Sequence, residues 1–336
     1  MRTLLIIFIF CSYTCHAQQS DSVENIVFEG AGIRGIAYSG AINELEQKDI
    51  LKNIKRVGGT SAGAITALLL TLGYSSGEIA NIVSSTSFKK FNDGRFFFLG
   101  GFHRLRKYYG WYRGKRFERW LTQLIDSKTG NRDISFAELH LQGTKDLYVT
   151  GTSLNKQKLI VFSYENYPQM KVKDAVRISM SIPLYFEAVF IDSTGKVVPH
   201  PRRKTGLDIM LDGGFIANFP IRIFDSSKYV NSSATNEFRV NNKTIGFRID
   251  SDAQIKNDTG NNGLASMQVT NFTEYLTAFY TLILENLNRQ TLTGEDWKRT
   301  VSIPDGAIGP RIRKLKKGEV NILVQNGKAS TEKYFK

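Results

Sequence analysis

The residues best suited to chemistry form the pentapeptide GTSAG at positions 59–63, which fits the pattern G-x-S-x-G. In this pattern a serine stands on a tight turn between a strand and a helix, and the flanking glycines, here Gly59 and Gly63, allow the close turn. A hydroxyl raised in this way can attack an ester carbonyl. We therefore predict Ser61 as a nucleophile, against the alternative of a glycine-rich turn that only precedes a core helix.

The sequence on either side of Ser61 fits that arrangement. Ile54 and Val57 lie in a short segment typical of a buried strand end, and residues 62–70 (AGAITALLL) form an apolar, helix-favouring run. A helix that begins here directs free backbone amides and the positive end of its dipole toward the serine oxygen.

A second glycine-rich stretch, GAGIRG at residues 30–35, lies between a predicted strand over residues 25–29 and a helical pattern over residues 36–46. The pattern also fits a dinucleotide fingerprint, which requires an acidic residue after a second strand about 20 residues on. Asp49 has that spacing but lies at a predicted helix end, so we favour an oxyanion hole built from backbone amides. Its predicted members are Gly30, Ala31, Gly32, Arg34 and Gly35, with the first three as amide donors and Arg34 as a fixed positive charge.

A third candidate is Asp212, which is followed by Gly213 and Gly214 at the end of an apolar, strand-like run. An isolated Asp-Gly pair is typical of a β-turn. Together with the two upstream stretches, however, Asp212 is the predicted general base that accepts the serine proton.

The histidines bear on this choice. In the usual order of a hydrolase triad the histidine follows the acid, yet none follows Asp212. A triad would have to use His200 with an earlier acid such as Asp174 or Asp192. A Ser61–Asp212 dyad is the simpler interpretation. The four histidines are His16, His103, His140 and His200.

These three motifs, in this order, resemble the patatin-like phospholipase family, which has G-G-G-x-R/K-G, G-x-S-x-G and D-G-G/A. Ala31 replaces the middle glycine, and its backbone amide remains available. Residues 174–183 (DAVRISMSIP) and 218–220 (NFP) also resemble segments of that family. The resemblance covers residues 25–250 and, more weakly, the C-terminal segment.

The resemblance implies an α/β fold, a three-layer α/β/α sandwich around a mostly parallel sheet. It also implies hydrolysis of fatty-acyl esters of phospholipids or other lipids, of the phospholipase A or lysophospholipase type, without a metal or cofactor. We expect one catalytic domain over residues 18–336, with its core at 25–250 and a C-terminal decoration at 251–336.

Composition and periodicity agree with an α/β fold. The 336 residues are 41% hydrophobic and 23% charged, as in globular proteins. Strand-like runs alternate with helical ones, which is typical of such folds. The apolar spacing over residues 267–287 predicts a helix packed on the sheet rather than a membrane span. The predicted strands lie at residues 147–151, 159–163, 186–191 and 244–249.

Residues 1–17 have the features of a signal peptide: a short positive start, the apolar run LLIIFIF and small residues before a cleavage point after Ala17. We therefore expect an exported protein, either secreted, periplasmic or associated with the envelope. A lipoprotein attached through Cys11 or Cys15 is the alternative.

The net charge of +14 favours anionic partners. Basic and aromatic residues are most concentrated at residues 102–120, which begin at Phe102 and end at Trp120 and hold seven of each kind. This mixture suits contact with an anionic membrane. It also fits a core-facing aromatic set with a solvated charged face and, less well, stacking on single-stranded nucleic acid. A membrane-binding module without catalysis therefore stays an alternative, and the sequence leaves the oligomeric state open.

Overall fold

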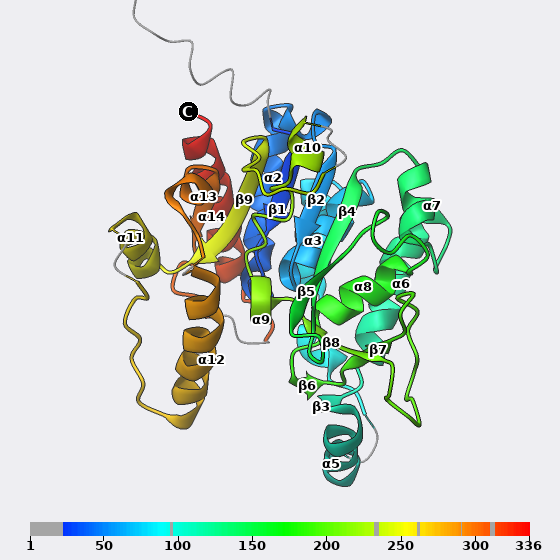
Figure 1. Cartoon of the computed structure of the whole chain (residues 1–336). Helices are drawn as coiled ribbons and strands as arrows, with labels where there is room; N and C mark the ends of the chain where they lie inside the picture. The colour runs from blue at the N-terminus through cyan, green and yellow to red at the C-terminus, as the bar shows by residue number, and fades with distance from the viewer. Residues whose placement is uncertain (1–22, 95–96, 232–234, 261–262, 290, 310–312) are drawn as a thin grey trace, which may run out of the picture.

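A mostly parallel β-sheet forms the centre of the computed structural model, which describes residues 23–94, 97–231, 235–260, 263–289, 291–309 and 313–336 (Figure 1). The strand order is β10-β9-β1-β2-β4-β8-β7, and β5 pairs with β4. Strands β10, β9, β1, β2 and β4 are parallel, whereas β5, β7 and β8 pair in antiparallel fashion. The predicted signal peptide lies outside the described residues.

Strands form near the predicted positions. The main sheet comprises β1 (Asn25–Phe28), β2 (Arg56–Gly59), β4 (Asp146–Ser153), β5 (Lys158–Phe162), β7 (Val189–Ile191), β8 (Asp208–Asp212), β9 (Thr244–Asp250) and β10 (Thr300–Pro304), and β3 (Gly110–Tyr112) pairs with β6 (Leu184–Phe186) in a separate small sheet. The run predicted at residues 186–191 is thus divided between two sheets. The reason is that the amides of Glu187 and Ala188 donate to the carbonyls of Tyr112 and Tyr108 instead of continuing one ladder.

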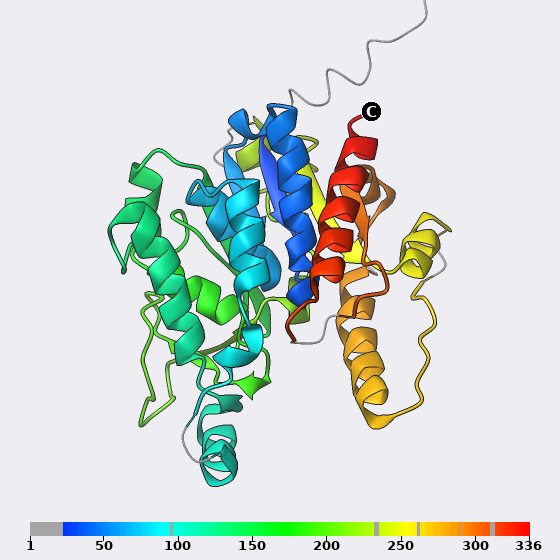
Figure 2. The same ribbon diagram turned by 180° about the vertical axis from the view of Figure 1, so that it is seen from behind.

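Helices cover both faces of the sheet, as expected for the α/β sandwich. Figure 2 shows α2, α3 and α14 on one face, whereas α9 and α10 lie on the other face in Figure 1. The helices are η1 (Gly32–Ile36), α2 (Ala37–Gln47), η2 (Ile50–Lys52), α3 (Ala62–Thr71), α4 (Ser76–Ser85), η3 (Phe88–Phe91), α5 (Phe97–Tyr108), α6 (Lys115–Thr129), α7 (Phe136–Leu141), α8 (Val172–Ser179), α9 (Gly214–Ala217), α10 (Ser227–Asn231), α11 (Asp252–Gly260), α12 (Phe272–Arg289), α13 (Gly294–Lys298) and α14 (Lys317–Tyr334).

The two faces carry hydrophobic cores of unequal size. The large cluster includes Ile26 and Phe28 of β1 together with most of the buried side chains of α2 and α3. The small cluster holds Val27, Tyr148 and Phe224. Because successive side chains of a strand point to opposite faces, Val27 packs in the small cluster while its neighbours Ile26 and Phe28 pack in the large one.

The C-terminal segment completes the sheet rather than decorating it. Strand β10 pairs with β9 over five residues, and α14 packs against α2. The two helices approach closely: a Cβ on Gly40 would lie 1.9 Å from the Val324 carbonyl oxygen, and one on Gly327 would lie 2.0 Å from that of Ala37. Only glycine fits at such a crossing.

Helix α12 forms over most of the predicted segment, and the part of its apolar surface that the structure describes faces solvent. It begins at Phe272, and its described apolar side chains Tyr275, Phe279 and Leu282 are each more than half exposed. These three side chains are therefore not part of the core between α12 and the rest of the protein. Within the described ranges, no helix combines the length and apolar character needed to cross a bilayer.

Candidate active site

The register of the central strands brings Ser61 and Asp212 to one level of the sheet. Gly59 of β2 pairs with Val149 of β4, and Asp212 of β8 pairs with Gly151, two residues further along the same strand. Ser61, two residues beyond Gly59, therefore lies level with Asp212 across the end of β4. Two residues separated by 151 positions in sequence thus lie together because β4 pairs with both of their strands.

Ser61 has the backbone conformation expected of a nucleophile on a sharp turn. Its φ is 52° and its ψ is −120°, a strained combination for a residue with a side chain. The flanking glycines permit it: a Cβ on Gly59 would lie 2.4 Å from the backbone of Gly63, and one on Gly63 would lie 2.3 Å from the Phe28 carbonyl oxygen. The strain presents the hydroxyl at the N-terminus of α3.

The Asp212 carboxyl group is buried beside two polar partners. The backbone amide of Gly214 donates a hydrogen bond to it at 2.8 Å, and the Ser61 side chain lies close enough to the carboxyl group to act as the second partner. Burial raises the pKa of Asp212 to about 7, although the Gly214 amide and the nearby Ser61 side chain oppose the shift. The group can therefore exchange a proton with Ser61 near neutral pH.

The predicted oxyanion loop lies beside the serine, with one change from expectation. A Cβ on Gly30 would lie 3.3 Å from the Ser61 Cβ, so the two residues are neighbours. However, the Gly30 amide already donates to the Asn218 carbonyl at 3.0 Å. In this conformation Gly30 is therefore not a free donor, and the expected donors narrow to the amides of Ala31 and Gly32.

The rest of the loop is held in shape by Arg34. Its Nε donates to the Ala31 carbonyl at 3.3 Å, and its Nη1 forms an ion pair with Asp305 at 3.2 Å. Gly32 has a φ of 57°, a backbone conformation that favours glycine. Gly35 is buried, and a Cβ added to it would lie 3.1 Å from the Ala62 Cβ. Besides supplying the predicted positive charge, Arg34 therefore supports the loop.

Two further side chains at the serine were not singled out as site residues in the sequence. Ser179 accepts a hydrogen bond from the Ser61 amide at 2.8 Å, and the Met180 sulfur lies 3.4 Å from the Ser61 hydroxyl oxygen. Both lie within the family-like segment at residues 174–183, so that segment was the available signal. In addition, the Asp212 amide donates to the Ser181 carbonyl, which links the segment to both members of the pair.

Asn218 connects the two loops. Its carbonyl accepts from the Gly30 amide, and its side-chain Nδ2 donates to the Gly30 carbonyl at 3.1 Å. Its own amide donates to Asn288 Oδ1, and Asn288 Nδ2 donates to the Gly214 carbonyl at 3.1 Å. The NFP segment at residues 218–220 therefore ties the oxyanion loop, the Asp212 turn and α12 together.

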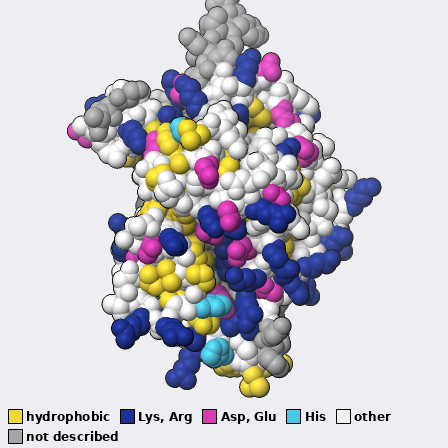
Figure 3. Space-filling model, turned by 90° about the vertical axis from the view of Figure 1, so that its right-hand side faces the viewer, with side chains coloured by type: hydrophobic (Ala, Val, Ile, Leu, Met, Phe, Trp, Pro, Cys, Tyr) yellow, Lys and Arg dark blue, Asp and Glu magenta, His cyan; other side chains and the backbone are white. Residues whose placement is uncertain are grey.

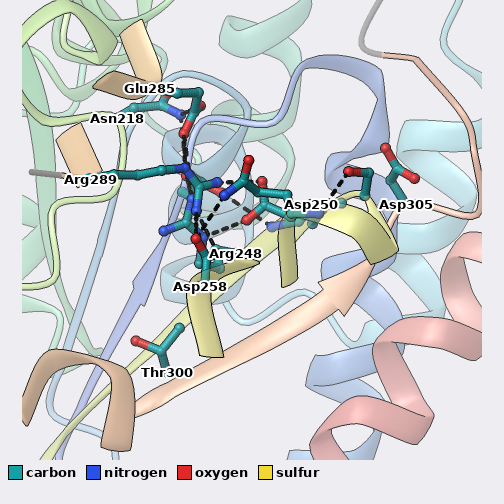
Figure 4. A network of polar contacts seen from close by, with 12 residues as sticks. Asn218, Arg248, Asp250, Asp258, Glu285, Arg289, Thr300 and Asp305 are labelled. Carbon is teal, nitrogen blue, oxygen red and sulfur yellow. Dashed lines mark hydrogen bonds and ion pairs between the residues drawn. The ribbon is translucent and has the colours of Figure 1, made fainter. Parts of the chain in front are cut away.

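A buried ionic network lies behind this junction (Figure 4). Arg248 contacts Asp250 at 2.7 Å, Glu29 at 3.2 Å and Glu285 at 3.5 Å, and Arg289 joins Asp250, Asp258 and Glu285. Burial raises the pKa of Glu29, and the neighbouring carboxylates of Glu285 and Asp250 add to the shift against the effect of Arg248. Since Glu29 directly precedes Gly30, the network fixes the start of the oxyanion loop.

The described histidines make their contacts elsewhere. His200 Nε2 lies 3.1 Å from Glu187 Oε2, and its ring stacks on Tyr108. It lines a separate cavity of about 490 Å³ whose lining includes neither Ser61 nor Asp212. His140 contacts Asp146, and His103 contacts Tyr108. His16 lies outside the described residues, and these contacts give a His200 triad no support.

Within the part of the chain that the structure describes, no cluster of three or more His, Cys, Asp or Glu side chains could hold a metal ion.

The aromatic residues of segment 102–120 are mostly packed inward. Phe117 is buried against Phe91 and Trp120, and Tyr112 packs on Tyr185. Phe102, at 66% exposed, is the exception. The core-facing interpretation therefore holds for most of these rings.

The family model described as "Patatin-like phospholipase" matches residues 26–225. YqhO of Bacillus subtilis strain 168 is 34% identical over 216 residues, which cover 60% of this chain and 67% of that protein. The "Probable lipid hydrolase 463L" of Invertebrate iridescent virus 6 is 27% identical over 201 residues, covering 60% of this chain and 62% of that one. The crystal structure of VipD from Legionella pneumophila has a similar fold, with a TM-score of 0.55 and 15% identity over 94% of this chain and 67% of that chain.

Proposed function

Since the chain belongs to the patatin-like phospholipase family, we propose that it is a serine acyl hydrolase acting on fatty-acyl esters of phospholipids or other lipids. The observation that carries the proposal is that the strained Ser61 and the buried Asp212 lie side by side at the same end of the sheet. The name of the viral relative, a probable lipid hydrolase, supports the lipid substrate.

In the proposed reaction the Ser61 oxygen attacks the ester carbonyl while its proton passes to the Asp212 carboxylate. The amides of Ala31 and Gly32 stabilise the oxyanion that forms. Collapse of the tetrahedral intermediate breaks the ester bond, and the leaving alcohol takes the proton from Asp212. Water then attacks the acyl-serine with Asp212 again as base. The fatty acid leaves, and Ser61 regains its proton.

The place of action is also a proposal. The signal-peptide features of residues 1–17 support export, and the net charge of +14 supports contact with an anionic membrane. In the segment from Phe102 to Trp120, only the exposed side chains are proposed to contact the membrane.

The pH dependence of kcat/KM is expected to report the Asp212 ionisation. The carboxylate is the active form, and its pKa is raised to about 7. Activity should therefore rise with pH through one ionisation near that value, fall about tenfold per unit below it, and level off above it. A soluble ester assayed across neutral pH provides the measurement. A midpoint near the ordinary value for an aspartate would contradict the assigned base.

Labelling by a fluorophosphonate probe tests the proposed nucleophile. We expect one modified residue, identified as Ser61 by peptide mass spectrometry, and no labelling of Ser61→Ala. Lipid extracts treated with wild type and Ser61→Ala, compared by mass spectrometry, should show released fatty acid only with wild type. Vesicle binding without labelling or lipid products would instead favour the non-catalytic membrane module.

A further inference from the structure

Large exposed apolar side chains gather around the end of the sheet that carries Ser61 and Asp212. Leu184 follows the Met180 segment closely and is 68% exposed, and Ile216 lies in α9 just after Asp212. Others lie on α5, on α12 and on the segment before α12. The members of this apolar rim are Phe98, Leu99, Phe102, Leu184, Ile216, Met267, Val269, Tyr275, Phe279 and Leu282.

Helix α5 forms one side of the rim. It projects below the sheet in both Figure 1 and Figure 2. Leu99 is 84% exposed and Phe102 is 66% exposed, and a spacing of three residues places them on one helical face. The base of α5 is fixed near the site because the Leu184 amide donates to the Tyr109 carbonyl at 3.2 Å.

Helix α12 forms the other side. It extends to the same lower end in both views, with α9 between it and α5 in Figure 1. Tyr275, Phe279 and Leu282 follow an i, i+4, i+7 spacing, so they form one stripe, and the rings of Tyr275 and Phe279 stack 6.3 Å apart. At its C-terminal end, α12 joins the Asp212 turn through the Asn288 bond to Gly214.

Positive charge accompanies the apolar tip of α5. Arg106 and Lys107 are exposed in its last turn. The Lys204 Nζ donates to the Lys107 carbonyl at 2.7 Å, which brings the neighbouring exposed residues Arg202 and Arg203 toward the same helix. Figure 3, which views the protein from the right-hand side of Figure 1, shows many Lys and Arg side chains over the middle and lower part of the surface. Apolar side chains at the tip with cations behind them match the layers of an anionic bilayer, in which acyl chains lie beneath charged headgroups.

We propose that the apolar rim is a membrane-docking surface, with α5 and α12 inserted on either side of the site into an anionic bilayer. Docked in this way, Ser61 faces the lipid surface and receives an acyl ester directly from it. The proposal rests on the proposed function only in that the bilayer supplies the acyl-ester substrate. Docking itself requires no catalysis.

The test compares pairs of substitutions in a Ser61→Ala background, so that the vesicles stay intact. Sedimentation with vesicles of phosphatidylcholine, with and without phosphatidylglycerol, measures binding. We expect Leu99→Ser with Phe102→Ser to weaken partition by about tenfold for each side chain removed, and Tyr275→Ser with Phe279→Ser to weaken it similarly. Binding of the parent protein should increase with phosphatidylglycerol and decrease with added salt.

Matched controls are available away from the rim. Leu141 on α7 is 82% exposed, close to the value for Leu99, and Phe238 is 64% exposed, close to that for Phe102. Leu141→Ser with Phe238→Ser should leave vesicle binding unchanged. Equal vesicle binding by rim and control variants would overturn the proposal. It would also be overturned if the rim substitutions changed only the molar mass measured by light scattering, because a second copy of the chain would then be the occupant of the rim.

Activity assays with Ser61 intact separate this proposal from the proposed function. The rim variants should hydrolyse a soluble short-chain ester at the wild-type rate and lose activity only on vesicles. If wild type fails on both substrates while the rim variants still lose vesicle binding, the proposed function is wrong and the docking surface stands.

Discussion

Replacing Asp212 with asparagine is expected to lower kcat by about 10³-fold or more, because the side chain can no longer take a proton from Ser61. Asparagine keeps the size of the side chain and an oxygen that can accept from the Gly214 amide, so the turn should persist. His200→Ala, in contrast, should retain a rate close to wild type, because His200 contacts Glu187 and Tyr108 rather than Ser61.

The measurement is steady-state hydrolysis of a soluble ester by the two purified variants, with circular dichroism to show that both are folded. Near-wild-type activity in Asp212→Asn together with loss in His200→Ala would exclude the dyad and favour a His-assisted esterase. Loss in both would assign a role to His200 that its contacts do not explain.

The placement of Ser61 and Asp212 could be predicted from sequence because each belongs to a local pattern with a steric cause. A serine with positive φ needs close backbone contacts on both sides, and only Gly59 and Gly63 permit them. The parallel order of β1, β2 and β4 follows from alternating strands and helices. Together these features place the predicted residues at one edge of the sheet.

Other parts of the site depend on contacts that no local pattern reveals. The Gly30 amide is occupied by Asn218, which lies 188 residues further along the chain. Periodicity correctly indicated an apolar face on α12, but it cannot state what that face meets, and the described part of the face meets solvent. Likewise, nothing in the sequence near Glu29 indicates that Arg248 and Glu285 complete its surroundings.

Removing Arg248 is the second change with a large expected effect. Arg248 is 1% exposed and compensates Glu29, Asp250 and Glu285, while its guanidinium also lies against the rings of Phe219 and Trp297. Arg248→Met leaves Glu29 buried without its arginine partner and leaves Asp250 and Glu285 to Arg289. We expect the free energy of unfolding to fall by about 3–5 kcal/mol.

The pH dependence of this loss distinguishes a charge effect from a packing effect. The pKa of Glu29 is already raised in the folded wild-type protein, and loss of Arg248 should raise it further; the pKa of Asp250, which Arg248 helps to hold low, should rise as well. The stability of the variant relative to wild type should therefore fall as pH increases. Urea denaturation should therefore show a larger deficit in mildly alkaline than in mildly acid buffer. Arg313→Met, which removes a bidentate pair with Glu319 at the protein surface, should have a much smaller effect that does not change between the two buffers. A deficit of equal size in both buffers would show instead that Arg248 acts mainly through its packing on the two rings.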